Sequence, residues 1–329
     1  MIISRTPLRI SFSGGMSDLP SYYEKQEGAV ISTSINKYIY IIVNKKFDNK
    51  IRASYSITEF AKTPDDLEHE LIKESLKLTN INKGIEIVSI SDIPSSGTGL
   101  GSSSTYTVGL LNVLYAYLGK SSSAEKLASQ ACNIELKKCL KKIGKQDQYI
   151  AAYGGLNYTQ FNPDGTTFVT PIICLPETKR KLEENLLFFY TGISRDISAE
   201  NILKETSNNI ISDEFKRDTI TQLVNIAKKM KLTLEENKLN QFGHLLHKAW
   251  LYKKQMQPNI SNPKIDHWYN LAIENGALGG KLNGAGSGGF LTFYAPKENH
   301  KKIINALSDI KQIPFKLEPQ GSKIIYMNE

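Results

Sequence analysis

The order of apolar and polar positions along the chain predicts strands separated by helices. Ile2–Phe12 alternates between the two kinds of residue and ends in the turn-like cluster SGGMSD, which indicates a strand. Two further strands are indicated by residues 35–47 (INKYIYIIVNKKF), rich in Ile, Tyr and Val, and by residues 84–94 (GIEIVSISDIP), where Pro94 ends the segment. The short apolar run LLFFY at residues 186–190 is typical of a buried strand.

Helical periodicity begins behind a loop of glycines and serines. Apolar residues recur there at a spacing of three or four, and Gly119 ends the segment. Residues 121–144 predict a second helix, with Ser122 or Ser123 as its N-cap and with lysines and Gly144 at its end. The periodic positions of the first helix are Val108, Leu111, Leu114, Tyr115 and Leu118.

The last part of the chain is mostly helical in pattern. Residues 198–275 are charged and helix-like, with breaks near Pro258 and Pro263. A glycine-rich loop then runs into an apolar strand. One helix and two strands are predicted to finish the chain, at residues 299–310, 313–319 and 323–328.

The chain of 329 residues is long enough for two domains of about 150 residues each. Its composition changes between Thr170 and Glu184, so we expect one domain at residues 1–178 and another at residues 179–329. Apolar residues make up 40% and charged residues 22%, as in a globular protein with a full core. No apolar run approaches the roughly 20 residues that cross a bilayer, and the start lacks the pattern of a secretory signal, so no membrane partner is expected.

The three cysteines, Cys132, Cys139 and Cys174, form no CxxC pair. An odd number of cysteines without such a pair argues against a disulfide framework and against a zinc site. We therefore expect buried thiols in the reducing environment of the cytoplasm.

The formal net charge is +8, from 41 basic and 33 acidic residues. A solvated basic surface explains such an excess, and so does the attraction of an anionic ligand such as a nucleotide or a sugar phosphate. Nucleic acid is not expected as a partner, because the lysines are scattered rather than interleaved with aromatic residues on one strip. A steep salt dependence of binding to DNA or RNA would indicate the contrary.

A loop of alternating glycines precedes the first predicted helix. The segment PSSGTGLGSSS (residues 94–104) contains Gly97, Gly99 and Gly101, followed by three serines. Glycines let the backbone approach phosphate oxygens, and the free N–H groups and dipole of a helix N-terminus attract anions. The loop has no lysine for the Walker pattern, and serines stand where G-x-G-x-x-G needs its third glycine. Taken alone, the segment fits both a phosphate cradle and a flexible turn with helix-capping serines.

A second glycine cluster lies near the C-terminus, in GGKLNGAGSGGF. Glycine costs up to about 1 kcal/mol relative to alanine in regular structure, so a dense cluster indicates a backbone that passes close to another group. A tight turn at the start of a strand is the plainer alternative. The cluster holds six glycines within eleven residues: Gly279, Gly280, Gly284, Gly286, Gly288 and Gly289.

Three segments, in this order, resemble the GHMP kinase superfamily: RTPLRISFSGGMSDLP, PSSGTGLGSSS and GGKLNGAGSGGF. The resemblance extends over most of the chain. It implies an α+β protein of two domains, with an N-terminal α/β domain built on a twisted, mostly antiparallel sheet and a C-terminal ferredoxin-like domain. The nucleotide and the sugar would meet in the cleft between them. SGGMSD and IGKQDQYIAAYGGLN are similar to one branch, the D-glycero-D-manno-heptose 7-phosphate kinases, while fucokinases share much of the pattern.

The resemblance implies an enzyme that uses ATP and Mg²⁺ to phosphorylate the anomeric hydroxyl of heptose 7-phosphate, giving the 1,7-bisphosphate for surface polysaccharide synthesis. A kinase for another sugar such as fucose stays open, and so does a sugar or nucleotide sensor that has lost the chemistry. The joint presence of Asp147, Glu135 and Ser103 speaks against the sensor. A homodimer also stays open. The nucleotide would lie on Gly97, Thr98, Gly99, Leu100, Gly101, Ser102, Ser103 and Ser104.

Phosphoryl transfer needs alignment, neutralised charge and an acceptor for the hydroxyl proton. Asp147 matches the family's catalytic aspartate, which accepts that proton, and Lys145 would help to keep Asp147 ionised if their side chains met. Arg9 matches an arginine that stabilises the γ-phosphate or holds Asp147. Taken without the resemblance, Asp147 caps the following helix and Arg9 faces solvent.

Glu135 and Ser103 match the family's Mg²⁺ ligands. One carboxylate and one hydroxyl, completed by phosphate oxygens and waters, suit this ion. Glu135 shares a partly apolar helix face with Ala131, where a charge is costly unless it is paired or bound to a metal. An exposed pair of Glu135 with Lys138 is the alternative, and the choice between Ser102 and Ser103 stays open.

Asp18 matches the family's sugar-binding acid, since a carboxylate can accept hydrogen bonds from two hydroxyl groups; a turn-capping aspartate is the alternative. Galactokinases have a glutamate where this chain has Gly15, which argues against galactose as the substrate. The phosphate of the acceptor needs a cation, for which Arg195 is the first candidate and Lys281 the second. The further substrate-binding residues that the resemblance implies are Gly14, Gly15, Gly284 and Gly286.

Overall fold

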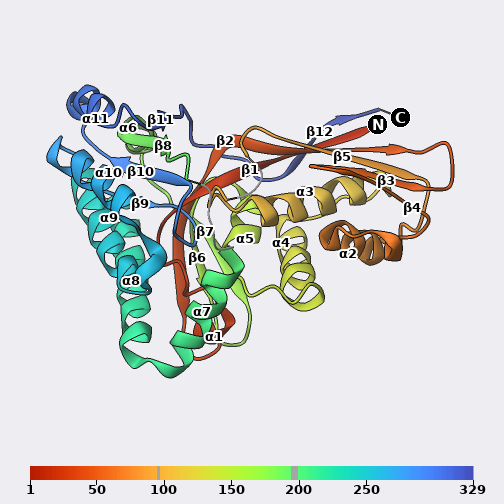
Figure 1. Ribbon diagram of the computed structural model, residues 1–329, viewed down its shortest axis with the longest axis horizontal. Coiled ribbons are helices and arrows are strands. Elements are labelled where there is room, and N and C mark those ends of the chain that lie inside the picture. The colour runs from red at the N-terminus through yellow and green to blue at the C-terminus, as the bar shows by residue number, and fades with distance from the viewer. Residues whose placement is uncertain (95–96, 194–198, 329) are drawn as a thin grey trace.

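The computed structural model describes residues 1–94, 97–193 and 199–328, and folds them into two sheets with helices packed against them (Figure 1). The first half of the chain forms β1 (Ile2–Ser13), α1 (Pro20–Tyr23), β2 (Gly28–Lys45), β3 (Ile51–Ser54), β4 (Thr58–Ala61), η1 (Pro64–Asp66), α2 (Glu70–Thr79), β5 (Ile85–Ser91), α3 (Ser102–Tyr117), α4 (Ala124–Cys132), η2 (Asn133–Lys138), α5 (Gln146–Tyr153), β6 (Leu156–Phe161) and β7 (Thr167–Pro171). The second half forms α6 (Pro176–Glu184), β8 (Leu186–Tyr190), α7 (Ala199–Ser212), α8 (Glu214–Glu235), α9 (Leu239–Lys254), η3 (Pro258–Ile260), α10 (Pro263–Glu274), β9 (Gly279–Leu282), β10 (Phe290–Tyr294), η4 (Lys297–Asn299), α11 (His300–Ala306), β11 (Lys311–Gln312) and β12 (Lys323–Met327).

The first sheet is mostly antiparallel. Six strands follow the order β12-β1-β2-β5-β3-β4, while β6 pairs with β2 and β7 pairs with β6. Strands β3 and β5 are parallel, and the other pairs in this sheet are antiparallel. Strand β2 is long enough for two successive partners, β6 at residues 28–33 and β5 at residues 39–45. Because β12 pairs with β1, the two ends of the chain lie together at one side of the sheet (Figure 1).

Helix α3 lies close against the first sheet because a glycine faces the strands. A Cβ atom at Gly109 would lie 2.6 Å from Thr6 Oγ1 in β1, and Ser4 Oγ donates a hydrogen bond to the Gly109 carbonyl at 2.9 Å. Most residues of α3 are buried, as expected for a helix between a sheet and further helices. This packing fixes the N-terminus of α3, on which the first glycine loop ends.

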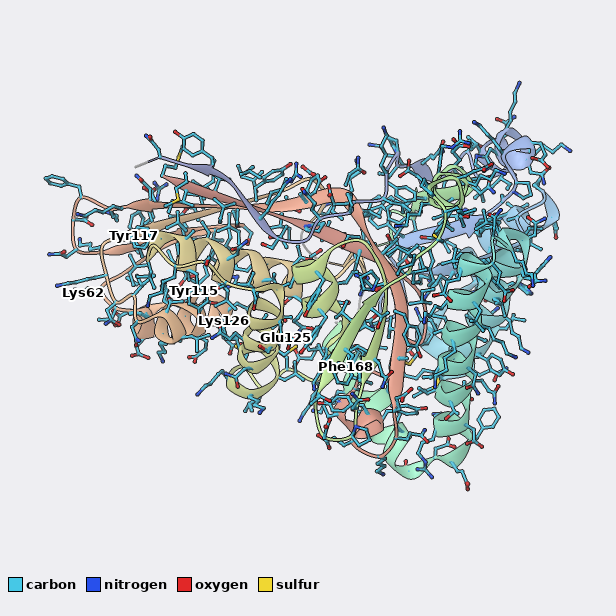
Figure 2. The ribbon with its side chains drawn as sticks, turned by 180° about the vertical axis from the view of Figure 1, so that it is seen from behind. Lys62, Tyr115, Tyr117, Glu125, Lys126 and Phe168 are labelled. Carbon is cyan, nitrogen blue, oxygen red and sulfur yellow. The ribbon has the colours of Figure 1, made fainter. Side chains whose placement is uncertain are left out.

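Helix α4 joins α3 to α5 through polar contacts on the face seen in Figure 2. Lys126 lies over the ring of Tyr115, with its Nζ atom 4.2 Å from the ring centroid. Glu125 accepts hydrogen bonds from the hydroxyl groups of Tyr149 and Tyr153 in α5, each at 3.0 Å. These contacts hold α5 in place relative to α3.

The second sheet has the ferredoxin-like arrangement that the resemblance implies. Its strands are antiparallel in the order β11-β8-β10-β9. Along the chain, β8 is followed by helices, then by β9 and β10, and then by α11 and β11, which is the β-α-β-β-α-β order of that motif. Inside the sheet the rings of Phe188 and Phe290 are stacked with centroids 4.4 Å apart. The α+β class and the two-part fold are thus confirmed.

The C-terminal end of β1 connects the two parts of the molecule. Phe12 packs edge-on against Phe242 of α9, with ring centroids 5.1 Å apart, and Ser13 Oγ donates to the Leu223 carbonyl of α8 at 2.8 Å. Lys281 of β9 donates from Nζ to the Phe12 carbonyl at 3.3 Å. The division of the chain into residues 1–178 and 179–329 stays a prediction. Strand β12 lies beyond residue 178 in the sequence but pairs with β1 in the first sheet.

Two of the expected elements have clearly different bounds in the structure. The strand expected at residues 35–47 begins already at Gly28, because its first residues pair with β6. The helix expected over residues 121–144 starts at Ala124 with Ser123 as its N-cap, but it ends in the π-helical turn η2. Leu140 then adopts a φ of +52°, and residues 139–145 form a loop.

The strand expected at residues 313–319 is also wrong. This segment is irregular and makes one isolated bridge, between Leu317 and Ile35. Pro314 and Pro319 lack the N–H groups that a ladder of hydrogen bonds would require.

The three cysteines are free thiols, of which Cys132 is buried while Cys139 and Cys174 are half-buried. The expectation of buried thiols is therefore right for Cys132 and wrong for the other two. Of the helices in the described ranges, none combines the length and the apolar character needed to cross a membrane.

Gly109→Ala is expected to destabilise the protein by about 1–3 kcal/mol, as overpacked core substitutions do. The added methyl group would collide with the Thr6 hydroxyl. This hydroxyl shares a hydrogen bond of 2.8 Å with the Ser322 hydroxyl, so a change of the Thr6 rotamer would break that bond. On a solvated helix the same change stabilises the protein by about 1 kcal/mol, so a loss of stability indicates the close contact between Gly109 and Thr6. The free energy of unfolding is measured by urea denaturation, and a gain in stability would contradict the close approach of α3 to β1.

Candidate active site

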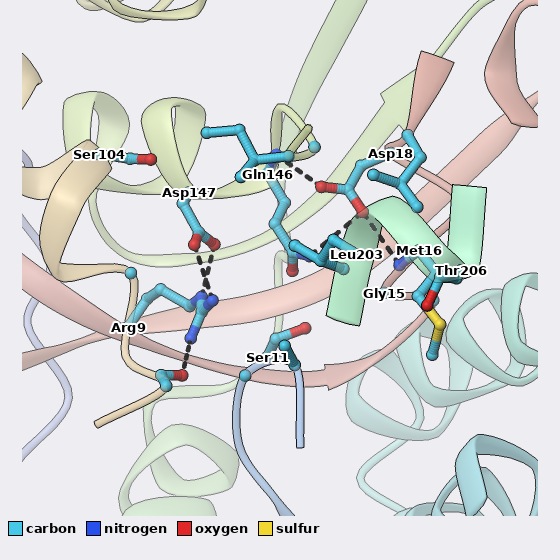
Figure 3. Close-up of a pocket in the computed structure, with 18 of the residues that line it drawn as sticks. Arg9, Ser11, Gly15, Met16, Asp18, Ser104, Gln146, Asp147, Leu203 and Thr206 are labelled. Atoms are coloured by element: carbon cyan, nitrogen blue, oxygen red, sulfur yellow. Dashed lines mark hydrogen bonds and ion pairs between the residues drawn. The ribbon is translucent and has the colours of Figure 1, made fainter. Parts of the chain in front are cut away.

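A cavity of about 370 Å³ lies where both glycine loops, the end of β1, the start of α5 and helix α7 meet (Figure 3). Most of the site residues predicted from the sequence line it, although they come from opposite ends of the chain. They are Arg9, Gly14, Gly15, Asp18, Gly97, Thr98, Gly99, Gly101, Ser102, Ser103, Ser104, Asp147, Lys281 and Gly284.

The first glycine loop is anchored to β1 and otherwise faces the cavity. Gly97, Gly99 and Gly101 have φ values of +73°, +74° and +79°, a backbone region that glycine adopts without steric cost. Leu100 lies in the core, and its carbonyl accepts a hydrogen bond from the Arg9 backbone N–H at 3.2 Å. The alternation of glycines with other residues therefore puts backbone, rather than side chains, along the cavity wall.

The N-terminus of α3 is open towards the cavity. The helix starts at Ser102 with Gly101 as its N-cap, and in the described part of the chain no side chain caps it. The amide groups of its first turn, together with the helix dipole, make this end suitable for an anion. A Cβ atom at Gly101 would lie 3.1 Å from Asp147 Oδ2, so the loop passes directly beside the predicted catalytic carboxylate.

The second glycine loop packs on the first. A Cβ atom at Gly289 would lie 2.4 Å from the Thr98 carbonyl oxygen, so any other residue there would separate the two loops. Gly286, with a φ of +129°, packs closely against Ile260 and is not among the described residues that line the cavity. Its predicted contact with substrate stays a prediction.

Lys253 of α9 holds the beginning of the second loop. Its ammonium group donates to the carbonyls of Leu282 at 2.9 Å and of Gly284 at 2.6 Å. Gly284 faces the cavity, as predicted, and Lys281 lies beside it on β9. Burial, and then the charge of Arg9, lower the pKa of Lys281 to about 7. Arg195, the other predicted cation, lies outside the described residues.

Arg9 and Asp147 form a bidentate ion pair (Figure 3). Arg9 Nε lies 2.7 Å from Asp147 Oδ1, and Nη2 lies 2.8 Å from Oδ2. The third nitrogen, Nη1, donates to the Gly99 carbonyl at 2.6 Å. Arg9 is 5% exposed, so this guanidinium connects the carboxylate to the first glycine loop from inside the protein. Facing solvent, the alternative for Arg9, is excluded.

Lys145 does not serve Asp147. Its ammonium donates to the Gly165 carbonyl at 2.9 Å and lies 4.2 Å from the centroid of the Tyr23 ring. The suggestion that Lys145 keeps Asp147 ionised is therefore wrong, because Lys145 precedes α5 and turns towards the β6–β7 loop. The cation that pairs with Asp147 is Arg9.

Asp18 is buried next to this pair and is held by Gln146 (Figure 3). Its carboxylate accepts hydrogen bonds from the backbone N–H groups of Met16 at 3.0 Å and Gln146 at 3.1 Å, and from Gln146 Nε2 at 3.2 Å. Burial raises the pKa of Asp18 to about 6, against the effect of the Gln146 amide. A Cβ atom at Gly144 would lie 1.8 Å from Asp18 Oδ2, so this glycine makes room for the carboxylate. Gln146 was missed from the sequence; its position next to Asp147 in GKQDQY was the only signal.

Glu135 is fully buried beneath the N-terminus of α3. Its Oε1 accepts from Ser103 Oγ at 2.9 Å and its Oε2 from Gln148 Nε2 at 2.5 Å, while Lys141 Nζ lies 4.0 Å from Oε1. Burial raises the pKa of Glu135, and the ammonium group of Lys141 opposes the shift most. Ser102 pairs instead with the Thr98 hydroxyl at 3.3 Å. Of the two serines, Ser103 is thus the one joined to Glu135, and the alternative of an exposed pair with Lys138 is excluded.

These donors fit a hydrated Mg²⁺ ion. A buried carboxylate and a hydroxyl group 2.9 Å apart, at the end of a helix that attracts phosphate, are hard oxygen ligands of the kind this ion takes while keeping several waters. The described residues contain no group of three or more His, Cys, Asp or Glu that could enclose a metal. Glu135 and Ser103 could therefore hold Mg²⁺ only together with ligands from outside the protein, such as phosphate oxygens.

A second cavity, of about 650 Å³, adjoins the first on the other side of the α3 N-terminus. The two share Ser102, Ser103 and Lys141 in their walls. The ring of His69 lies 4.5 Å from that of Tyr55 and 5.3 Å from that of Tyr106, measured between centroids. This cavity was not foreseen, since much of its wall comes from β5, α2 and the β3–β4 turn, which no motif connects.

Comparison with known proteins agrees with this arrangement. The model of the GHMP kinases N terminal domain matches residues 68–155, and that of the GHMP kinases C terminal matches residues 230–311. A D-glycero-alpha-D-manno-heptose 7-phosphate kinase of Campylobacter jejuni is 30% identical over 321 residues, covering 93% of each chain. A bifunctional fucokinase/GDP-fucose pyrophosphorylase of Arabidopsis thaliana is 25% identical over 94% of this chain and 31% of its own.

A solved structure shows the same fold. The D-glycero-D-manno-heptose 1-phosphate kinase of Bacteroides thetaiotaomicron superposes with a TM-score of 0.81 over 100% of both chains, at 22% identity. Fold, site and matches together define a phosphotransferase with ATP as phosphate donor and a hydroxyl group as acceptor. The chain belongs to the GHMP kinase family, and within it to the sugar kinases. The family predicted from three glycine-containing segments is confirmed, whereas the roles of single residues stay predictions.

The stability of the wild-type protein relative to Asp18→Asn is expected to fall as the pH rises from about 4 to about 7. The pKa of Asp18 in the folded protein, about 6, lies above the ordinary value of 3.8. The stability that Asp18 contributes to the folded protein is therefore complete below about pH 4 and is lost as the pH rises through 6. A shift of about two units corresponds to roughly 3 kcal/mol. Urea denaturation of both proteins across this range measures the difference. Parallel pH profiles would show that Asp18 ionises without penalty.

Proposed function

We propose that this sugar kinase transfers the γ-phosphoryl group of ATP to the anomeric hydroxyl of D-glycero-D-manno-heptose 7-phosphate. The product would be the 1,7-bisphosphate, made in the cytoplasm as a precursor of surface polysaccharide. The observation that carries the proposal is Arg9, which links Asp147 to the Gly99 carbonyl of the first glycine loop within one cavity. The similarity to the Campylobacter jejuni heptose 7-phosphate kinase supports the choice of substrate.

The nucleotide would extend across both cavities. The second cavity offers aromatic surface for the base, together with the buried hydroxyl of Tyr106, which has no partner among the described residues. From there the phosphates would pass Ser102 and Ser103 along the open N-terminus of α3. The γ-phosphate would then lie in the first cavity, beside Asp147.

Asp147 would accept the proton of the attacking hydroxyl. Its carboxylate has about four lone-pair sites, of which Arg9 takes two, so it can still accept a hydrogen bond from a sugar. Arg9 fixes the direction of the carboxylate that would act as the base. The sensor alternative has no support in this arrangement.

Asp18 and Gln146 would hold the sugar. Asp18 is 2% exposed, yet it lines the cavity, and Gln146 Oε1 is buried without a partner among the described residues. A sugar presents hydroxyl groups that can donate to both of these oxygens. Gly15 lines the same cavity, and a Cβ atom there would lie 3.6 Å from Gln146 Nε2, so this glycine lies beside the proposed sugar site.

Glu135 and Ser103 would hold Mg²⁺ together with the nucleotide phosphates. Bound there, the ion would neutralise charge on the β- and γ-phosphates. Gln148 orients the Glu135 carboxylate from behind, through its hydrogen bond of 2.5 Å.

Lys281 is the described residue that would bind the phosphate of the acceptor, with Arg195 as the other candidate. It is 7% exposed, lines the first cavity, and has the Phe12 carbonyl as its hydrogen-bond partner. Phe12 directly precedes the turn that carries Gly14, Gly15 and Asp18, so Lys281 lies beside the proposed sugar site. An arriving phosphate would raise the pKa of Lys281 from about 7 and hold it protonated.

Asp147→Asn is expected to lower kcat by about 10²–10⁴-fold, because an amide cannot accept the proton. Nucleotide affinity, measured by isothermal titration calorimetry, should stay close to that of the wild type. The melting temperature is measured alongside, since the substitution also removes the ion pair with Arg9. A variant that is folded and turns over at the wild-type rate would remove Asp147 from the mechanism.

In a coupled assay of ADP release, heptose 7-phosphate should have the highest kcat/KM of a panel that includes unphosphorylated heptose and L-fucose. Lys281→Met should raise KM for heptose 7-phosphate about tenfold, the order of one charge-assisted hydrogen bond, with Lys281→Arg as the charge-retaining control. KM for unphosphorylated heptose should change little. Fucose as the best acceptor, or equal losses for both heptoses, would contradict the substrate or the role of Lys281 respectively.

A further inference from the structure

Lys141 lies at the boundary between the two cavities and belongs to the walls of both. Its ammonium group is 3.2 Å from Ser103 Oγ and 4.0 Å from Glu135 Oε1. The side chain is 21% exposed, whereas Glu135 is fully buried, so the cation faces the cavities with the carboxylate behind it. The cavities meet at Ser102, Ser103 and Lys141, so phosphates that extend from one cavity to the other would lie beside this ammonium group.

The backbone holds Lys141 in this position. After the π-helical turn η2, the Cys139 N–H donates to the Ile134 carbonyl at 2.8 Å, and the Lys141 N–H donates to the Glu135 carbonyl at 2.9 Å. Leu140 between them has a φ of +52°, which folds the chain back over η2. The lysine side chain is thereby turned over the carboxylate that precedes it by six residues. An ordinary continuation of the helix would have directed it elsewhere.

The charges at this boundary favour a cation when a nucleotide is bound. Glu135 places a negative charge directly beneath the path of the triphosphate, and the charge is costly to bury alone. The open amides of α3 offset part of the repulsion with partial charges only. Lys141 is the described side chain with a full positive charge on the shared wall of the two cavities.

The geometry points to Lys141 as a nucleotide-binding residue that contacts the phosphates at the boundary and supplies the positive charge between them and Glu135 when no Mg²⁺ is bound. This inference rests on the proposed use of ATP across both cavities. It adds a binding residue outside the three glycine-containing segments. It also predicts that the protein binds nucleotide without metal, and that Lys141 is the reason.

The test compares Lys141→Met with Lys142→Met, a change of the neighbouring lysine. Lys142 is exposed and is not among the described residues that line either cavity. Dissociation constants are measured by calorimetry for ATP, ADP and adenosine, each in EDTA and in excess Mg²⁺. Lys141→Met should weaken ATP and ADP tenfold or more in EDTA and by a smaller factor in Mg²⁺. Adenosine, which has no phosphate, should bind both variants and the wild type equally.

A second variant keeps the test decisive if Lys141→Met does not fold. Lys141→Arg retains the charge and should bind metal-free ATP within about threefold of the wild type, whereas Lys141→Gln should lose affinity as Lys141→Met does. Equal weakening of adenosine and ATP would show a structural role and overturn the inference. So would unchanged affinity for metal-free ATP. A folded wild-type protein that binds no ATP in either buffer would instead refute the proposed function.

Discussion

The bidentate ion pair between Arg9 and Asp147 is the interaction on which the site depends. It joins β1, which carries Arg9, to the first glycine loop and to the start of α5. In the sequence, Gly99 of the loop lies 90 residues from Arg9, and Asp147 of α5 lies 138 residues from it. Its geometry depends on close contact, because Gly101 leaves only enough room for the Asp147 carboxylate beside the loop. Because both ends of the pair are attached to packed elements, the carboxylate is directed before any ligand arrives, and phosphoryl transfer requires such alignment.

The site combines several buried charges that would be unfavourable in a protein built for stability alone. Burial moves the pKa of Asp18 upwards and that of Lys281 downwards, which is the common effect of removing ionisable groups from water. Each charge is partly compensated by a donor or acceptor from a different element, such as Gln146 for Asp18 and the Phe12 carbonyl for Lys281. A sugar phosphate and a nucleotide carry the hydroxyl groups and negative charges that would complete these partnerships, which is the physical reason for keeping such groups in the cavity.

Local sequence patterns predicted much of the fold. The strand at residues 186–190 and the N-cap at Ser123 agree with the structure because apolar runs and capping hydroxyls act over a few residues. Residues 139–144 of the loop were predicted as the end of a helix, since their lysine-rich sequence is compatible with one. The reversal at Leu140 follows the π-helical turn η2, which packs against α2 and α4, and it has no local signal. The long strand β2 was likewise predicted only in part, because its first residues are fixed by β6, more than 120 residues further on.

By itself, the sequence determined the family and the two glycine loops, because these lie in short segments of characteristic residue types. The candidates Arg9, Asp18, Ser103, Glu135 and Asp147 followed from the resemblance of the sequence to that family. Only the tertiary structure decided which of these groups meet. It paired Arg9 rather than Lys145 with Asp147, chose Ser103 over Ser102 for Glu135, and added Gln146, Gln148 and Lys141. The reason is physical: hydrogen bonds and ion pairs act over about 3–4 Å, and such distances between remote segments are set by the packing of α3, α5 and both sheets, which no local pattern contains.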